Sequence, residues 1–250
     1  MSGCVRLERH GAVGEIVIDR PDKHNALTPR MFEELRDVCA EINNDDSVNA
    51  VVLRGAGEKA FCAGTDINTL KEYESFWHWR NRVDYVTQIR SLRKPCIGAI
   101  KGWALGGGNE LAVACDLRVA ARNAVFGAPE VTLGWLGAGG TSQYLPRLVG
   151  YGQAMRILLT GERLSAEEAF RIGLVEYLVE PGEELAKARS LAETIASYSP
   201  IATQTTKAAI RAGMNGNLEL GLQIENELMA LCFAMGEDKA GAERFAGRKR

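Results

Sequence analysis

The stretch KGWALGGGNELAVACD, residues 101–116, determines how the rest of the chain is interpreted. Its apolar start predicts a strand, its three consecutive glycines predict a tight turn, and the residues after them predict a short helix. Glu110 is the only charged side chain between Lys101 and Asp116, and an apolar run follows it. A buried carboxylate without a partner is costly unless its pKa is raised. Glu110 is therefore either a catalytic acid or base, or a cap of the helix N-terminus.

Length and composition allow one large α/β domain. The 250 residues are 46% hydrophobic and 25% charged, as in ordinary soluble globular proteins. A formal net charge of -2 argues against a dedicated nucleic-acid surface. The six cysteines are widely spaced, without C-x-x-C or H-E-x-x-H motifs, so we expect reduced thiols, no metal and a cytoplasmic location. No apolar stretch approaches the roughly 18 residues of a membrane span, so no membrane partner is expected.

The first part of the chain alternates strands with helices. Alternating side chains at 5–9 and 15–19 predict a β-hairpin, and Thr28 before Pro29 predicts a helix N-terminus. The further predicted elements are strands at 49–54, 96–100, 117–121 and 124–126, a helix at 108–115 and an imperfect helical stripe at 71–92. Repeated strand-to-helix passages predict a largely parallel sheet that binds ligands at its strand ends.

A second isolated carboxylate lies in the glycine-rich segment 127–147. Glu130 is the only charged residue between Asn123 and Pro146. Two isolated glutamates in two glycine-rich apolar segments are harder to explain as helix caps than one alone. The pair therefore favours a catalytic interpretation.

The end of the chain is helical. A capping box at 165–168 predicts a helix that ends at Gly173 and leads to a strand at 175–179. Helices are then predicted at 183–197, 201–212, 217–235 and 237–247. We expect this tail to pack on a partner subunit, with a boundary between Pro181 and Pro200.

The glycine-rich turns predict sites for negatively charged oxygen. Backbone N–H groups at 106–108 point out of a helix N-terminus, where the helix dipole favours phosphate or an oxyanion. The dinucleotide motif G-x-G-x-x-G fails because position 111 is Leu, and neither a phosphate-binding P-loop nor a G-x-S-x-G motif occurs. What remains is a donor-rich loop at Thr65, another at Gly107, and two isolated glutamates, a combination that suits enolate chemistry.

Four motifs resemble a known family. The stretches FCAGTDI, GWALGGGNELAVACD, FGAPEVTLG and LTGERLSAEEAFRIGLV, which begin at residues 61, 102, 126 and 159, are similar to the crotonase, or enoyl-CoA hydratase/isomerase, superfamily. The resemblance implies an α/β fold built as a spiral of strand-strand-helix units over residues 1–195. It also implies a C-terminal helical region at 196–250 that packs subunits into homotrimers or hexamers.

The resemblance implies roles for particular residues. The backbone N–H groups of Thr65 and Gly107 would form an oxyanion hole for the thioester carbonyl of an acyl-CoA substrate. Glu110 would activate water, and Glu130 would deliver a proton to the α-carbon. Because an oxyanion develops only during the reaction, each donor would stabilise the transition state by roughly 3 kcal/mol.

Substrate contacts are implied as well. The segment with Ala63, Asp66, Ile67 and Asn68 would lie along CoA, together with Thr65 and Gly107, and no cofactor is implied because CoA is part of the substrate. Trp135 stands where a smaller residue is frequent, so it would either shape the acyl pocket or pack in the core or at a subunit contact.

Both glutamates together favour hydration of a trans-2-enoyl-CoA to a 3-hydroxyacyl-CoA. An enoyl-CoA isomerase needs only one carboxylate to move a proton, so isomerisation stays an alternative, as does another acyl-CoA reaction of the superfamily. A non-catalytic acyl-CoA or RNA-binding relative is a third possibility, against which the near-neutral charge and the intact glutamate pair argue.

Overall fold

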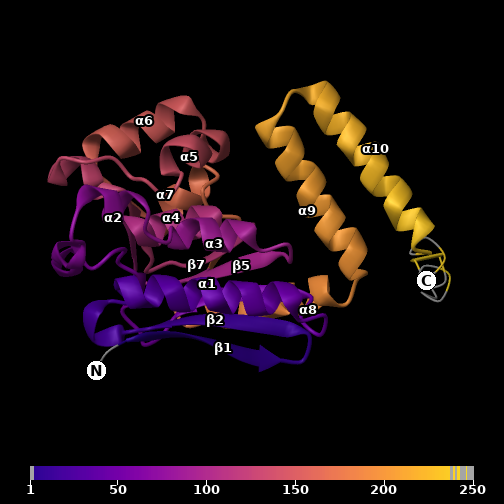
Figure 1. Cartoon of the computed structure of the whole chain (residues 1–250), viewed down its shortest axis with the longest axis horizontal. Coiled ribbons are helices and arrows are strands. Elements are labelled where there is room, and N and C mark those ends of the chain that lie inside the picture. Colours follow the sequence, from indigo (N-terminus) through magenta and orange to yellow (C-terminus); the bar gives the residue numbers. More distant parts are fainter. Residues whose placement is uncertain (1–2, 237–238, 240, 243–245, 247–250) are drawn as a thin grey trace.

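Two β-sheets and the helices that pack on them form the body of the protein (Figure 1). The computed structural model describes residues 3–236, 239, 241–242 and 246. The six-stranded sheet has the order β1-β2-β3-β5-β7-β10, and the four-stranded sheet has the order β4-β6-β8-β9. Among the strand pairs of the described residues, β1–β2 and β8–β9 are antiparallel and the others are parallel. The predicted largely parallel α/β architecture is therefore confirmed.

The strands of the large sheet are β1 (Cys4–His10), β2 (Val13–Asp19), β3 (Ala50–Gly55), β5 (Cys96–Ile100), β7 (Leu117–Ala121) and β10 (Tyr177–Val179). Those of the small sheet are β4 (Ala60–Cys62), β6 (Trp103–Leu105), β8 (Val125–Gly127) and β9 (Arg163–Ser165). Strands of the small sheet are too short to show an alternating pattern, which is why the sequence predicted only β6, before the three glycines, and β8 among them.

The α-helices are α1 (Pro29–Asn44), α2 (Phe76–Arg80), α3 (Tyr85–Ser91), α4 (Gly107–Ala114), α5 (Thr141–Val149), α6 (Tyr151–Thr160), α7 (Ala166–Arg171), α8 (Glu184–Ala196), α9 (Pro200–Asn215) and α10 (Leu218–Ala234). Short 3-10 helices are η1 (Pro21–Lys23), η2 (Ile67–Glu72) and η3 (Pro129–Leu133). Most of the helix predicted at 237–247 lies outside the described residues.

Alternate residues of β3 enter two separate cores. Val51 and Leu53 pack in the larger core with α1, whereas Ala50 and Val52 pack on the opposite face with α8. Side chains of a strand point alternately to its two faces, and both faces of this strand are covered by helices. The apolar run at 49–54 is therefore a strand that is buried on both sides. Helix α8 covers this sheet, and the predicted limit of the core at residue 195 falls at its end. The division of the chain into a core and a C-terminal region stays a prediction.

The helical stripe predicted at 71–92 is wrong as one element. The segment forms the end of η2 and then α2 and α3, each with its own N-cap. The Ser75 side chain accepts a hydrogen bond from His78 N, and the Asp84 side chain accepts one from Val86 N. These caps favour new helix starts at 76 and 85 over one continuous helix. The strand predicted at 175–179 likewise begins only at Tyr177.

Helices α9 and α10 form an antiparallel pair at one side of the body (Figure 1). Large apolar side chains on this pair are exposed, among them Met214, Leu218, Met229 and Phe233. Several exposed large apolar side chains on one helix pair are typical of an interaction face. Among the described residues, none of the helices combines the length and apolar character needed to cross a lipid bilayer.

Candidate active site

A cleft of about 1040 Å³ opens where three parallel strands of the small sheet end. Ala63 and Thr65 follow β4, Gly106 and Gly107 follow β6, and Glu130 follows β8, and all five line the cleft. Ligands in α/β proteins bind at the carboxyl ends of strands, where the loops diverge. The cleft therefore lies at strand ends, where the sequence predicts ligand binding, and binding there stays a prediction.

Close approach between two loops explains the glycines at the cleft. A methyl group placed on Gly107 would lie 1.7 Å from the hydroxyl oxygen of Tyr85. One placed on Gly64, whose φ is 89°, would lie 2.7 Å from the Gly107 nitrogen. No side chain fits at either position, and glycine also tolerates positive φ. The Thr65 loop and the N-terminus of α4 therefore come into direct contact.

The backbone N–H groups of Thr65 and Gly107 have no hydrogen-bond acceptor among the residues that the structure describes. Gly107 begins α4, and the first N–H groups of a helix have no acceptor within the helix. Both residues line the cleft. These two donors are thus available to a negatively charged oxygen bound there.

The two isolated glutamates come together across the cleft. Glu110 lies in the first turn of α4 and is 6% exposed, and its Oε1 accepts a hydrogen bond from Gly139 N at 2.9 Å. Glu130 lies in η3 and is 9% exposed, and its Oε2 has no hydrogen-bond partner among the described residues. A methyl group placed on Gly137 would lie 3.1 Å from Glu110 Oε1 and 3.7 Å from Glu130 Cδ. Both carboxyl groups therefore face the same small volume.

Burial raises the pKa of both carboxyl groups. Loss of solvation is the largest cause for Glu110, whose pKa is lowered in part by the Gly139 N–H and raised further by the charge of Glu130. The pKa of Glu130 is also raised, chiefly by burial. Raised carboxyl pKa values bring a group closer to proton exchange near neutral pH, which suits acid and base catalysis.

Most of the other predicted site residues also line the cleft. Ile67 and Trp135 lie in its wall, and both side chains are about half exposed. Asp66 and Asn68 do not line it. The Asp66 carboxylate instead forms an ion pair with Arg20 at 2.9 Å and accepts a hydrogen bond from Asn68 N at 3.1 Å. The expected contact of this segment with CoA stays a prediction.

Sequence reasoning missed Tyr85 as a site residue. Tyr85 is buried, stacks on Phe32 with ring centroids 4.7 Å apart, and lines the cleft. Its hydroxyl lies 3.1 Å from Thr65 Oγ1. The one available signal was an apolar stripe at 71–92 that fitted a surface helix equally well. Arg82 and Trp79 of the same segment were missed for the same reason.

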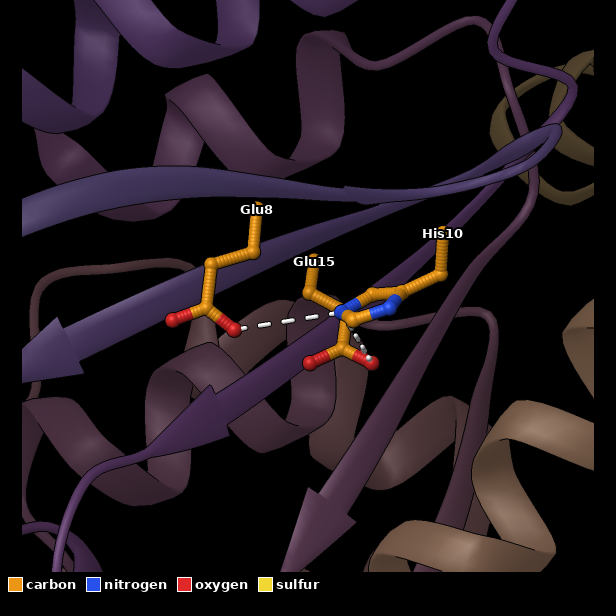
Figure 2. A group of neighbouring side chains, drawn as sticks. All are labelled: Glu8, His10 and Glu15. Carbon is orange, nitrogen blue, oxygen red and sulfur yellow. Dashed lines mark ion pairs between the residues drawn. The ribbon is translucent and has the colours of Figure 1, made fainter.

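A second group of titratable side chains lies outside the cleft lining, on β1 and β2 (Figure 2). Glu8, His10 and Glu15 gather there with geometry that could hold a metal ion. The carboxylates are nevertheless engaged by arginines: Arg54 lies 2.9 Å from an oxygen of each glutamate, and Arg189 also pairs with Glu15. Positive guanidinium groups compete with a cation for these oxygens. The group is therefore an ion-pair network that joins the hairpin to β3 and α8.

Comparison with known proteins agrees with this fold. The family described as "Enoyl-CoA hydratase/isomerase" matches residues 8–250. The chain is 41% identical over 251 residues to the "Short-chain-enoyl-CoA hydratase" of Clostridium acetobutylicum, covering 98% of this chain and 95% of that protein. It is 39% identical over 248 residues to the "(E)-benzylidenesuccinyl-CoA hydratase" of Thauera aromatica, covering 98% and 96%.

A solved structure also resembles the chain over nearly its whole length. The crystal structure of an enoyl-CoA hydratase from Bacillus anthracis matches it with a TM-score of 0.91 at 36% identity, covering 98% of this chain and 96% of that one. The resemblance to the crotonase superfamily is thereby confirmed for both sequence and fold. The chain belongs to the enoyl-CoA hydratase/isomerase family of enzymes.

Proposed function

We propose that this enzyme hydrates a trans-2-enoyl-CoA to a 3-hydroxyacyl-CoA. The observation that carries the proposal is the approach of Glu110 and Glu130 to one volume beside the free N–H groups of Thr65 and Gly107. Adding water across a conjugated double bond needs a base for water, a proton donor for the α-carbon and stabilisation of the thioester enolate. These four residues can supply all three. Relatives at about 40% identity are named as hydratases of CoA thioesters, which supports the same reaction class.

In the proposed mechanism, ionised Glu110 removes a proton from water as the water oxygen bonds to the β-carbon. The electron pair of the double bond moves toward the thioester carbonyl, whose oxygen becomes negative between the N–H groups of Thr65 and Gly107. Protonated Glu130 then donates its proton to the α-carbon as the carbonyl re-forms. Exchange with solvent returns both carboxyl groups to their starting states.

The geometry supports this division of roles. The Gly139 N–H holds one oxygen of Glu110 and favours its ionised form. Glu130 Oε2 has no donor facing it among the described residues, and burial favours its protonated form. A fixed ionised base next to a protonated acid is the arrangement that hydration requires. Each backbone donor would contribute roughly 3 kcal/mol to stabilisation of the transition state.

The rest of the proposed assignment concerns binding, assembly and location. Main-chain groups of 63–68 would hold CoA, and Trp135 would limit the acyl pocket that it lines. The exposed apolar residues of α9 and α10 would pack on neighbouring subunits in a homotrimer or hexamer. We further propose a cytoplasmic location, because the cysteines of the chain are free thiols.

Isomerisation of an enoyl-CoA is the second candidate function. One carboxylate can move a proton between the α- and γ-carbons, and Glu130, with an unengaged oxygen, could do so alone. A non-catalytic acyl-CoA or RNA-binding role fits less well, because both glutamates are buried at high cost beside unengaged donors.

The test is a panel of trans-2-enoyl-CoA and trans-3-enoyl-CoA thioesters with different acyl groups, followed by enoyl absorbance and product identification. The variants Glu110→Gln and Glu130→Gln are compared with the exposed control Glu167→Gln. Hydration predicts that either site variant loses at least a hundredfold in kcat, with the control unchanged. Conversion of a trans-3-enoyl-CoA that survives Glu110→Gln would favour isomerisation. Absence of any reaction with every thioester would refute the proposed function.

A further inference from the structure

Arg82 gives the cleft a positive charge that the proposed hydration does not use. It is the only lysine, arginine or histidine among the described residues that line the cleft. The acidic residues in the lining are Glu74, Asp84, Glu110 and Glu130. A lone guanidinium in the wall of a binding cleft is expected to have an anionic partner, in the protein or in its ligand.

Aromatic side chains hold Arg82 in place. Its guanidinium carbon lies 3.8 Å from the centroid of the Trp79 ring, and its Nη1 donates a hydrogen bond to the Trp79 backbone oxygen at 2.9 Å. Trp79 in turn meets Tyr73 edge to face, with centroids 5.2 Å apart. Stacking on an aromatic ring orients the planar guanidinium without using its remaining N–H donors.

No carboxylate among the described residues pairs with Arg82. The neighbouring Asp84 is the N-cap of α3. Its carboxylate accepts a hydrogen bond from Val86 N at 3.0 Å and another from the Thr87 hydroxyl. Exposed Glu74 lies 3.5 Å from His78 instead. Arg82 therefore keeps four of its five N–H donors for a ligand, since one is bound to Trp79.

We propose that Arg82 binds a second carboxylate at the far end of the acyl group, so that the preferred substrates are monothioesters of dicarboxylic acids. This inference rests on the proposed function for the reaction itself. The guanidinium fork matches a planar carboxylate with two parallel hydrogen bonds. Tyr73, Phe76 and Trp79, which also line the cleft, would cover the carbon chain or ring between the thioester and that carboxylate.

The phosphates of CoA are the other anion that could meet Arg82. They carry several charges and are strongly hydrated, whereas Arg82 lies on an aromatic wall and offers a single fork. This environment favours one carboxylate on an otherwise apolar chain. Because both sources are anionic, the test must separate an effect of the acyl end from an effect on CoA as a whole.

The test is calorimetric titration with two saturated, unreactive thioesters of equal chain length, hexanoyl-CoA and adipoyl-CoA, the latter ending in a carboxylate. We expect the wild type to bind adipoyl-CoA about tenfold to a hundredfold more tightly, as a charge-assisted hydrogen-bond pair allows. Arg82→Gln is expected to reduce this ratio to near one. Arg82→Lys, which keeps the charge and the stem, should retain part of it. The ratio in Arg80→Gln, whose guanidinium lies outside the cleft lining, should equal that of the wild type.

Hydration of trans-2-hexenoyl-CoA is compared with that of its six-carbon analogue that ends in a carboxylate. The wild type is expected to prefer the analogue in kcat/KM by the same factor as in the binding of the saturated thioesters. Equal affinities of the wild type for the two saturated thioesters would overturn the inference. If both Arg82 variants bind hexanoyl-CoA, adipoyl-CoA and free CoA more weakly by the same factor, Arg82 contacts a CoA phosphate, and this result would also overturn the inference. If no enoyl thioester is hydrated but the affinity ratio holds, the proposed function fails while the Arg82 site stands.

Discussion

The hydroxyl of Tyr85 lies 3.1 Å from Thr65 Oγ1 and fills the space that a side chain on Gly107 would need. One buried aromatic residue of α3 therefore touches both loops whose backbone N–H groups are proposed to bind the thioester oxygen. Stacking on Phe32 of α1 fixes the position of its ring. The distance between the two donors is consequently set by a side chain that does not itself react.

Tyr85→Phe tests this positioning role. The change removes the hydrogen bond to Thr65 but keeps the stacked ring, so we expect kcat to fall about tenfold with little change in KM. Steady-state hydration of an enoyl-CoA is the measurement. Tyr144→Phe is the matched control, because Tyr144 stacks under Arg90 and does not line the cleft. Wild-type kcat in Tyr85→Phe would show that packing alone positions the donors.

Gly107→Ala tests the close approach itself. The added methyl group would lie 1.7 Å from Tyr85, so the ring or α4 must move, and we expect a loss of about 1–3 kcal/mol in unfolding free energy. Turnover should fall at least tenfold, because displaced donors no longer face the oxyanion. Gly152→Ala, in a helix and with no neighbouring atom within 4 Å, should instead raise stability by about 0.5–1 kcal/mol. Chemical denaturation and turnover of both variants give the answer.

The acid limb of the pH profile reports on Glu110. Burial raises the pKa of Glu110, so kcat/KM should begin to fall, as pH is lowered, above the usual titration range of a glutamate. In the proposed mechanism Glu130 must keep its proton, so the wild type should also lose activity on the alkaline side, and the residual activity of Glu130→Gln should keep the acid limb but lose the alkaline limb. Profiles of kcat/KM for both proteins test this. An alkaline limb that remains in Glu130→Gln would contradict the role of Glu130 as the proton donor.

The contribution of Glu110 to the free energy of unfolding should fall as pH rises, whereas that of a carboxylate in an ion pair falls as pH is lowered. Because the folded-state pKa of Glu110 is raised, folding favours its protonated form, and the cost of burying the charge grows as pH rises from the unfolded pKa to the folded pKa. Glu110→Gln should therefore stabilise the protein at neutral pH and give little gain at a pH below the unfolded value. Denaturation midpoints at the two pH values measure the difference. An equal shift at both would assign the effect to packing.

The ion pair that anchors α9 should be worth far more than a surface pair. Lys207 of α9 is 9% exposed and lies 2.6 Å from an oxygen of Asp116, to which Arg211 also pairs at 3.1 Å. Asp116→Asn leaves the buried Lys207 charge without its counter-ion, and we expect a loss of about 3–5 kcal/mol in unfolding free energy. Glu167→Gln, which breaks an exposed pair with Arg122, should cost less than about 1 kcal/mol. Urea denaturation of both variants provides the comparison.

The two glutamates could be predicted from the sequence because each stands alone in an apolar, glycine-rich segment. A glutamate without charged sequence neighbours is a signal that holds in the folded protein as well, because few nearby residues can form an ion pair with it. The apolar run at 49–54 and the N-cap Thr28 before Pro29 of α1 were local signals of the same kind. The pairing of Thr65 with Gly107 was predicted only through the resemblance to a family, because no local pattern links residues so far apart in the chain.

Tyr85 and Arg82 could not be predicted for a physical reason. Their segment has the composition of an amphipathic surface helix, and its interruption depends on the caps Ser75 and Asp84, which compete with a continuous helix by small free-energy differences. Asp66 shows the converse. Its sequence neighbours indicated a binding segment, yet its carboxylate is engaged by Arg20, a contact made across a long sequence separation.

Asp116 lies two residues after the end of α4 and six positions after Glu110, and its carboxylate pairs with Lys207 and Arg211 of α9. A partner that packs against the α9–α10 pair would therefore act on an ion pair that lies just beyond the C-terminal end of the helix that carries Glu110. Truncation of the chain before α9 is therefore expected to affect more than the surface of the protein. It would remove Lys207 and Arg211, the two cations that pair with Asp116 just beyond α4.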